Sequence, residues 1–245
     1  MLYVLDSVKN IIFAQIFKMA KNRRKNKNED ELLVDVTQVA DQAQTFIERN
    51  QTMIIAVVAG LLIIVGGLLA YKMVYQAPLE KTATDQMFKA EYQFQRDSFA
   101  LALESPGGGY DGLLDIIDNY GGTKASNLAK YYAGISYLNL NRFEDAISYL
   151  KSHSSTGRVT SITKYGALGD AHSELQDFSS ALSSYKKATQ NTPNALLTPY
   201  YLNKLGLLYR HQGDTASATA AFKRIKKEFP QSAEAQDIDK YLVAN

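Results

Sequence analysis

The chain has 245 residues, of which 46% are hydrophobic and 21% are charged, as is usual for a folded protein. Its 27 basic and 25 acidic side chains nearly cancel, which excludes the strong positive field of a nucleic-acid-binding domain. The absence of cysteine excludes a disulfide framework and a thiol nucleophile, and three scattered histidines do not indicate a metal site. We therefore expect no cofactor, no metal and no nucleic-acid partner.

Residues 1–52 form a mainly polar N-terminal segment. Its first eighteen residues are apolar but interrupted by Asp6 and Lys9, and an ordinary polar start follows Met19. We hypothesise that native translation begins at Met19, so that residues 1–18 are not translated natively. Polar residues 28–51 carry a weak helical pattern, which predicts a short helix before the next segment.

Residues 53–71, "MIIAVVAGLLIIVGGLLAY", contain no charged side chain. At about 1.5 Å per residue, a helix of this length crosses the ~30 Å hydrocarbon core of a bilayer. A buried core helix is the alternative, but such helices are rarely apolar on every face. Because the run is long and no cleavage site follows it, we expect an uncleaved transmembrane helix rather than a signal peptide.

The charges that flank this apolar run predict its orientation. The basic cluster "KNRRKNK", residues 21–27, precedes the run, and only scattered lysines follow it. Lys and Arg accumulate on the cytoplasmic side of membrane proteins. We therefore expect a single-pass protein of the bacterial inner membrane, with residues 1–52 in the cytoplasm and the C-terminal part in the periplasm.

Residues 72–112 are predicted to form a linker helix followed by a glycine-rich loop. Apolar side chains recur at mainly helical spacing between residues 79 and 103. The stretch "SPGGGYDG", residues 105–112, is typical of a loop. It lacks the Gly-Lys-Ser/Thr sequence of a phosphate-binding loop, so we assign it no ligand.

Residues 113–245 contain a repeat of about 34 residues. In a unit that starts at Ile162, Gly169 takes the eighth position, and Gly134 and Gly206 take the same position in the flanking units. This pattern is typical of tetratricopeptide repeats (TPR) and predicts an all-α fold. We expect an N-terminal single transmembrane helix followed by a TPR-type α-solenoid of about three to four helical hairpins. Further signature positions of the central unit are held by Tyr165, Leu168, Phe178, Ala181, Tyr185, Ala188 and Pro193.

The stretch "KYGALGDAH", residues 164–172, carries two glycines three residues apart. This spacing also occurs in the GxxG loop of some RNA-binding domains. The repeat places these residues inside a helix, which argues against that loop. We interpret Gly169 as a site of close helix approach, and Gly166 as a groove position that leaves open space.

The first helix of each TPR unit lines a groove, which is the predicted protein-binding surface. Tyr131 and Ile135 occupy positions where some TPR domains carry Lys and Asn to hold a carboxylate, so that clamp is absent. No convergent polar set indicates catalysis, and the stretch "SHSSTG" around His153 lacks the context of a nucleophile. We therefore expect no enzymatic activity. The candidate groove residues are Tyr131, Ile135, Leu138, Asn139, Gly166, Asp170, Glu174, Tyr200, Asn203 and Arg210.

The layout resembles bacterial inner-membrane TPR proteins of the YfgM-like type, which are ancillary subunits of the Sec translocon. The resemblance covers about residues 45–245 and rests on one N-terminal span followed by "YGGTKASNLAKYYAGISYL", "GDAHSEL" and "KKEFPQSAEAQDIDKYL". It implies a periplasmic domain near the Sec translocon that cooperates with periplasmic chaperones.

The leading interpretation is a non-enzymatic binding module, anchored in the membrane, that docks a partner or an emerging polypeptide near the translocon. One alternative is a structural scaffold of an envelope complex. Another is an import-receptor-like protein whose TPR domain lies in the cytosol. The sequence does not discriminate among their clients.

Overall fold

The computed structural model describes residues 41–190 and 193–242, and all regular structure in these residues is helical. The chain divides into two units, Met1–Leu68 and Leu69–Asn245. The hypothesis of a start at Met19 and most of the helix expected over residues 28–51 lie outside the described residues. Residues 41–49 are helical.

Helix α3, Gln51–Ala70, contains no charged and no buried side chain. It begins the helical stretch Gln51–Gln95, whose apolar window contains no buried residue. Among the described residues, this is the one helix long and apolar enough to cross a membrane. A short π-helix, η1, Tyr71–Gln76, follows α3.

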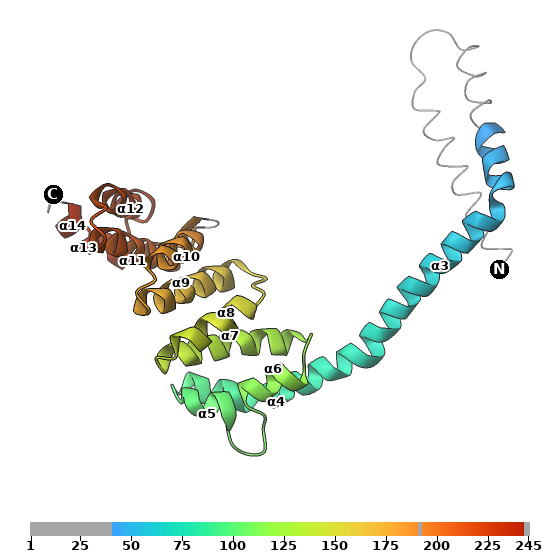
Figure 1. Cartoon of the computed structure of the whole chain (residues 1–245), viewed down its shortest axis with the longest axis horizontal. Coiled ribbons are helices and arrows are strands. Elements are labelled where there is room, and N and C mark those ends of the chain that lie inside the picture. The colour runs from blue at the N-terminus through green and yellow to red at the C-terminus, as the bar shows by residue number, and fades with distance from the viewer. Residues whose placement is uncertain (1–40, 191–192, 243–245) are drawn as a thin grey trace, which may run out of the picture. The chain divides into compact units, whose positions relative to one another are not determined.

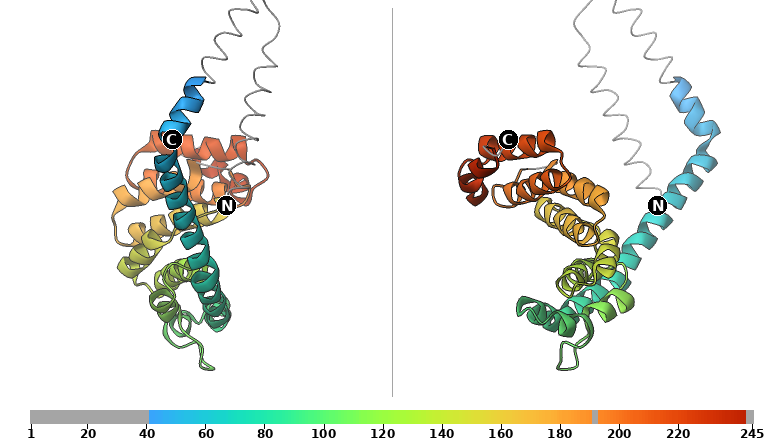
Figure 2. Two further views of the ribbon diagram at one scale, coloured as in Figure 1. Left: turned by 90° about the vertical axis from the view of Figure 1, so that its right-hand side faces the viewer. Right: turned by 60° about the vertical axis from the view of Figure 1, so that its left-hand side comes forward.

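The second unit is built from consecutive helical hairpins. Four pairs follow one another along the chain: α4–α5, α7–α8, α9–α10 and α11–α12 (Figures 1 and 2). The short α6 lies between the first and second pairs, and α13 and α14 follow the last. The bounds are α4 Ala77–Gln95, α5 Phe99–Glu104, α6 Leu113–Asn119, α7 Lys124–Asn139, α8 Phe143–Ser152, α9 Arg158–Glu174, α10 Phe178–Gln190, α11 Leu197–His211, α12 Thr215–Glu228, α13 Ala233–Asp237 and α14 Asp239–Leu242.

A glycine on the first helix of three hairpins lets a large side chain of the second helix come close. A Cβ atom added to Gly169 would lie 2.4 Å from the Tyr185 ring, which is too close for any real contact. Equivalent pairs, always sixteen residues apart, are Gly134 with Leu150 and Gly206 with Phe222. The structure therefore gives Gly169 the packing role expected of it. This contact offsets the cost of roughly 1 kcal/mol that a glycine imposes on a helix.

The turns inside the four hairpins share one backbone geometry. Each has a residue with positive φ that ends the first helix, and the next residue's N–H returns to a carbonyl five residues earlier. This is the hydrogen-bond pattern of a Schellman turn. The four residues with positive φ are Asp97, Asn141, Gln176 and Gly213.

The α4–α5 hairpin is therefore a further copy of the repeat, in the part that we had expected to be a linker. Ala90 and Ala102 are fully buried. Their separations in sequence from Asp97 are the same as those of Gly169 and Ala181 from Gln176. The sequence pattern did not reveal this copy because alanine replaces the glycine. The helical domain therefore reaches back through residues 72–112.

Helix α4 is tied to the start of α7 by its own side chain. The Glu80 carboxylate accepts hydrogen bonds from the backbone N–H groups of Lys124, at 2.7 Å, and Ala125, at 3.1 Å. A negative charge at a helix N-terminus satisfies free N–H groups and the helix dipole together. The loop expected after α5 spans residues 105–112, where three successive glycines have positive φ.

Candidate protein-binding surface

The candidate groove residues on α7 are largely used in packing. Tyr131, Ile135 and Leu138 are half-buried and contact the apolar cluster of Leu150, Ala167 and Leu168. Asn139, at the end of α7, is exposed. This part of the surface therefore offers a partner little free apolar area.

Gly166 does not leave open space, contrary to our expectation. It is buried, and an added Cβ atom would lie 1.9 Å from Cζ of Tyr201, a residue of α11. Glycine is needed there because the Tyr201 ring of the next hairpin lies directly on the α9 backbone. The "KYGALGDAH" stretch thus has two packing glycines, Gly169 within its own hairpin and Gly166 toward the next.

Asp170 joins three helices. Its Oδ1 accepts a hydrogen bond from the Tyr185 hydroxyl of α10, at 2.6 Å, and one from Lys204 Nζ of α11, at 2.7 Å. Burial favours a lower pKa for Lys204, but the hydrogen bond and charge of Asp170 outweigh it, so the pKa of Lys204 is raised. Burial, with the nearby Asp170, raises the pKa of Tyr185 far above its usual range. Asp170 is therefore a structural carboxylate that joins α9 to α10 and α11.

Aromatic rings surround this ion pair. The Tyr201 ring lies 5.0 Å from that of Tyr200 and 6.3 Å from that of Tyr185, measured between centroids. Lys204 Nζ lies 4.9 Å from the Tyr200 centroid. Tyr200 is exposed, and the Lys204 cation lies beside its ring. Sequence analysis missed Tyr201 and Lys204; the tyrosine pair "YY" at 200–201 was the available signal.

Asn203 has an unsatisfied polar atom. Its Oδ1 is buried and has no hydrogen-bond partner among the described residues. Beside it, Tyr241 and Lys240 help to line an open hollow of about 320 Å³ between α11 and the C-terminal helices. A buried carbonyl oxygen without a donor costs free energy.

The remaining candidates lie at helix ends and are exposed. Glu174 is at the end of α9, and Arg210 is near the end of α11. The Arg210 guanidinium lies 4.6 Å from the centroid of Tyr241. The structure therefore joins Asp170 to Lys204 of α11, beside Tyr200, while Asn139 and Glu174 stand at separate helix ends.

His153 is buried among packing groups rather than presented as a nucleophile's base. Its Nδ1 lies 2.8 Å from the Asn127 carbonyl oxygen, and its own carbonyl accepts a hydrogen bond from Lys164 Nζ. The Tyr131 ring lies 5.5 Å from the imidazole. In residues 41–190 and 193–242, no cluster of three or more His, Asp or Glu side chains could hold a metal ion.

Comparison with known families gives one match that covers about two thirds of the chain. The model of the N-terminal domain of EccA1, a protein of the ESX-1 type VII secretion system, matches residues 79–239. The chain belongs to this family. The match spans α4 to the start of α14, so the EccA1 N-terminal domain family has the all-α, TPR-like helical fold seen here.

This membership corrects the resemblance inferred from the sequence. The YfgM-like identification is wrong, because the family model that matches is that of the EccA1 N-terminal domain. No comparison supports Sec translocon subunits or periplasmic chaperones as partners. TPR-like proteins share the small and aromatic positions that fix hairpin packing, so those positions do not discriminate between secretion systems. No curated protein matches the chain.

Proposed function

We propose that this protein is a non-enzymatic scaffold of a secretion complex, anchored to a membrane by α3, which binds protein partners through its helical repeats. The observation that carries the proposal is the family match over residues 79–239, which names a secretion-system protein and covers nearly all of the hairpin stack. Anchoring would confine the domain to the membrane surface and raise its effective concentration there.

The binding surface that we propose is centred on α11. Tyr200 is exposed beside the Lys204 cation. An extended polypeptide supplies side chains that stack on an aromatic ring and acidic groups that a nearby cation attracts. We therefore assign an extended segment of a partner protein to this surface.

Site-specific photocrosslinking in cells tests this assignment. A photoreactive residue at Tyr200 is expected to capture a component of the secretion complex. Glu174 is the matched control position, because it is exposed on a different helix end. Equal capture from Glu174 and Tyr200, or capture of proteins unrelated to secretion only, would contradict the proposal.

The side of the membrane is a separate part of the proposal. We propose that the basic cluster at residues 21–27 holds the N-terminus in the cytoplasm, which places the helical domain on the opposite side. Protease added to spheroplasts should then degrade the domain while the inner membrane is intact. Resistance until that membrane is broken would instead show a cytosolic domain, as in an import receptor.

A further inference from the structure

The two ends of the hairpin stack differ in how their apolar side chains are covered. At the C-terminal end, α13 and α14 act as a cap: Ile238 is buried, and the Tyr241 ring stacks on Phe222 at 5.1 Å. No large hydrophobic side chain described after Tyr200 is exposed. Stacked-repeat proteins need such caps because an open end leaves apolar surface in water.

The N-terminal end, formed by α4, α5 and the loop 105–112, has no comparable cover among the described residues. Phe88 is 62% exposed and Leu101 is 49% exposed, and Tyr92 and Tyr110 are exposed as well. The apolar groups on this end therefore remain available to a partner.

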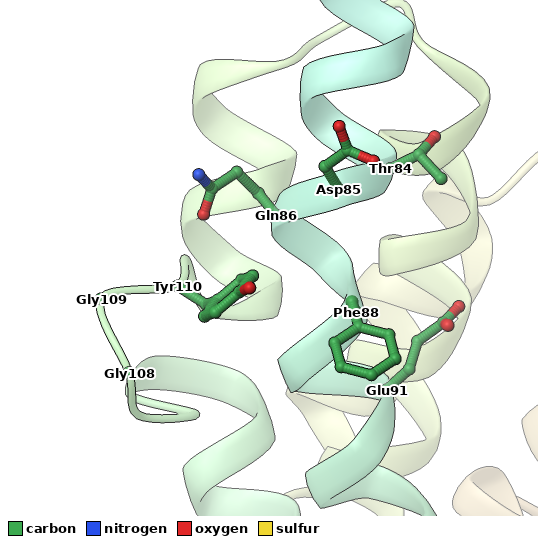
Figure 3. A pocket seen from close by; sticks show the side chains of 8 residues that line it. All are labelled: Thr84, Asp85, Gln86, Phe88, Glu91, Gly108, Gly109 and Tyr110. Atoms are coloured by element: carbon green, nitrogen blue, oxygen red, sulfur yellow. The ribbon is translucent and has the colours of Figure 1, made fainter.

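A hollow of about 730 Å³ lies on this end, between α4 and the glycine-rich loop. Figure 3 shows Phe88 and Glu91 next to each other on α4, with Tyr110 of the loop on the opposite side. Gly108 and Gly109 form the loop wall without side chains, which keeps the hollow open. We call this the N-terminal hollow.

The charged side chains of the N-terminal hollow are both acidic. Asp85 and Glu91 line it, and neither forms an ion pair with a described residue. Two nearby cations, Lys89 and Arg96, lie over the Tyr92 ring, at 5.0 and 5.4 Å from its centroid. Burial raises the pKa of Glu91, as expected for a carboxylate that loses water without gaining a cation.

We propose that the N-terminal hollow docks a segment of a partner protein in which aliphatic side chains alternate with Lys or Arg. The aliphatic groups pack against Phe88 and Tyr110, and the cations pair with Asp85 and Glu91. Charge complementarity selects this occupant, since an acidic segment would meet two unpaired carboxylates. This surface is separate from the one on α11 and does not depend on it.

Fluorescence anisotropy on the full chain in phosphatidylcholine nanodiscs tests the proposal. The probe is a fluorescein-labelled peptide in which leucine and lysine alternate, and the matched probe replaces lysine with glutamate. We expect the lysine peptide to bind, and Asp85→Lys or Phe88→Ser to weaken its binding roughly tenfold each. Both side chains are exposed, so both variants should fold.

Two control variants separate this site from general effects. Glu174→Lys makes the same charge change outside the hollow, and Leu196→Ser removes an even more exposed apolar group. Neither should change the affinity. Equal weakening by the controls, or equal binding of the glutamate peptide, would overturn the proposal. So would a dimer in light scattering that Phe88→Ser dissociates, because the occupant would then be a second copy of this chain.

Discussion

At the scale of single residues, the two glycines of α9 differ in the aromatic ring that each one contacts. Gly169 faces the near edge of the Tyr185 ring, and Tyr185 is fixed by its hydrogen bond to Asp170. Gly166 faces the far end of the Tyr201 ring, a tip that can swing aside at smaller cost. The two glycines therefore face aromatic rings that differ in how easily they can be displaced.

We predict that Gly169→Ala lowers the free energy of unfolding by about 1–3 kcal/mol, as overpacking of a core usually does. Gly166→Ala should cost less, because the Tyr201 ring can move and alanine favours the helix by roughly 1 kcal/mol. Urea unfolding of the two variants measures both effects. In a Tyr201→Ala background, Gly166→Ala should become stabilising; a loss of stability in that background would contradict the assigned contact.

The buried histidines make stability depend on pH. Burial lowers the pKa of His153, helped by the charges of Lys164 and Lys130, and burial also lowers the pKa of His172 despite the nearby Asp177. The folded state thus binds fewer protons than the unfolded state, whose histidines titrate near about 6.5. The contribution of the neutral histidines to the free energy of unfolding is complete above that pH. It is lost as the pH falls toward the lowered pKa values of the histidines in the folded state.

We therefore predict that the free energy of unfolding falls between about pH 6.5 and pH 5, by at most about 1.4 kcal/mol per pH unit for each histidine. His172→Tyr should reduce this slope by about half, because it removes one of the two buried histidines. Tyrosine should fit at this position, since it occupies the same repeat position at Tyr137 and Tyr209. Urea unfolding across this range is the measurement. An unchanged slope in the variant would show that His172 does not contribute.

At the scale of elements, the hairpins are joined by specific polar contacts as well as by apolar packing. The Glu80 carboxylate completes the N-terminus of α7, and Gln76 Nε2 donates to the Gly122 carbonyl before it, at 3.3 Å. These contacts attach η1 and α4 to α7 across more than forty residues of sequence. No local pattern in either helix indicates the partner.

We predict that Glu80→Gln lowers the free energy of unfolding by about 1 kcal/mol, since it removes a negative charge from a helix N-terminus. Amide hydrogen exchange should become faster at Lys124 and Ala125. Asp85→Asn is the matched control, because this exposed carboxylate of the same helix forms no described ion pair. If amide hydrogen exchange at the start of α7 is unchanged in Glu80→Gln, the Glu80 carboxylate does not stabilise the N-terminus of that helix.

At the scale of the whole molecule, the apolar core extends into the first hairpin rather than being confined to the regular repeats. Buried Ala83, Met87 and Ala90 of α4 belong to the same cluster as Ala129 and Ala133 of α7. Each hairpin of a repeat protein buries its apolar face only against its neighbours. Removal of the first hairpin would therefore uncover the second.

We predict that a chain starting at residue 113 is less stable by several kcal/mol than one starting at Leu69, because α7 loses its apolar cover. Thermal unfolding of both chains by circular dichroism measures the difference. Equal melting temperatures would mean that α4 and α5 are dispensable, as their initial interpretation as a linker implied.

The all-α fold class and the regular hairpins could be predicted from the sequence, because they depend on patterns among residues that are close in sequence. Gly134, Gly169 and Gly206 recur at nearly constant spacing, and the uncharged run at residues 53–71 is visible in one stretch. The first hairpin was not recognised, because Ala90 fills the small position without the glycine. This hairpin is recognised as a repeat unit because the positive φ of Asp97 matches the turns of the other hairpins, which only the tertiary structure shows.

The proposed binding surface on α11 rests on a sequence prediction for its position, but its chemistry was not predicted. The sequence determined that α11 carries groove positions, because helical periodicity places Tyr200 and Asn203 on one face. Only the tertiary structure decided that Tyr201 covers Gly166, that Lys204 neutralises Asp170 and that the oxygen of Asn203 has no partner. The physical reason is that periodicity within one helix is set by neighbours in sequence, whereas the contacts of Gly166 and Asp170 with α11 join residues more than thirty positions apart.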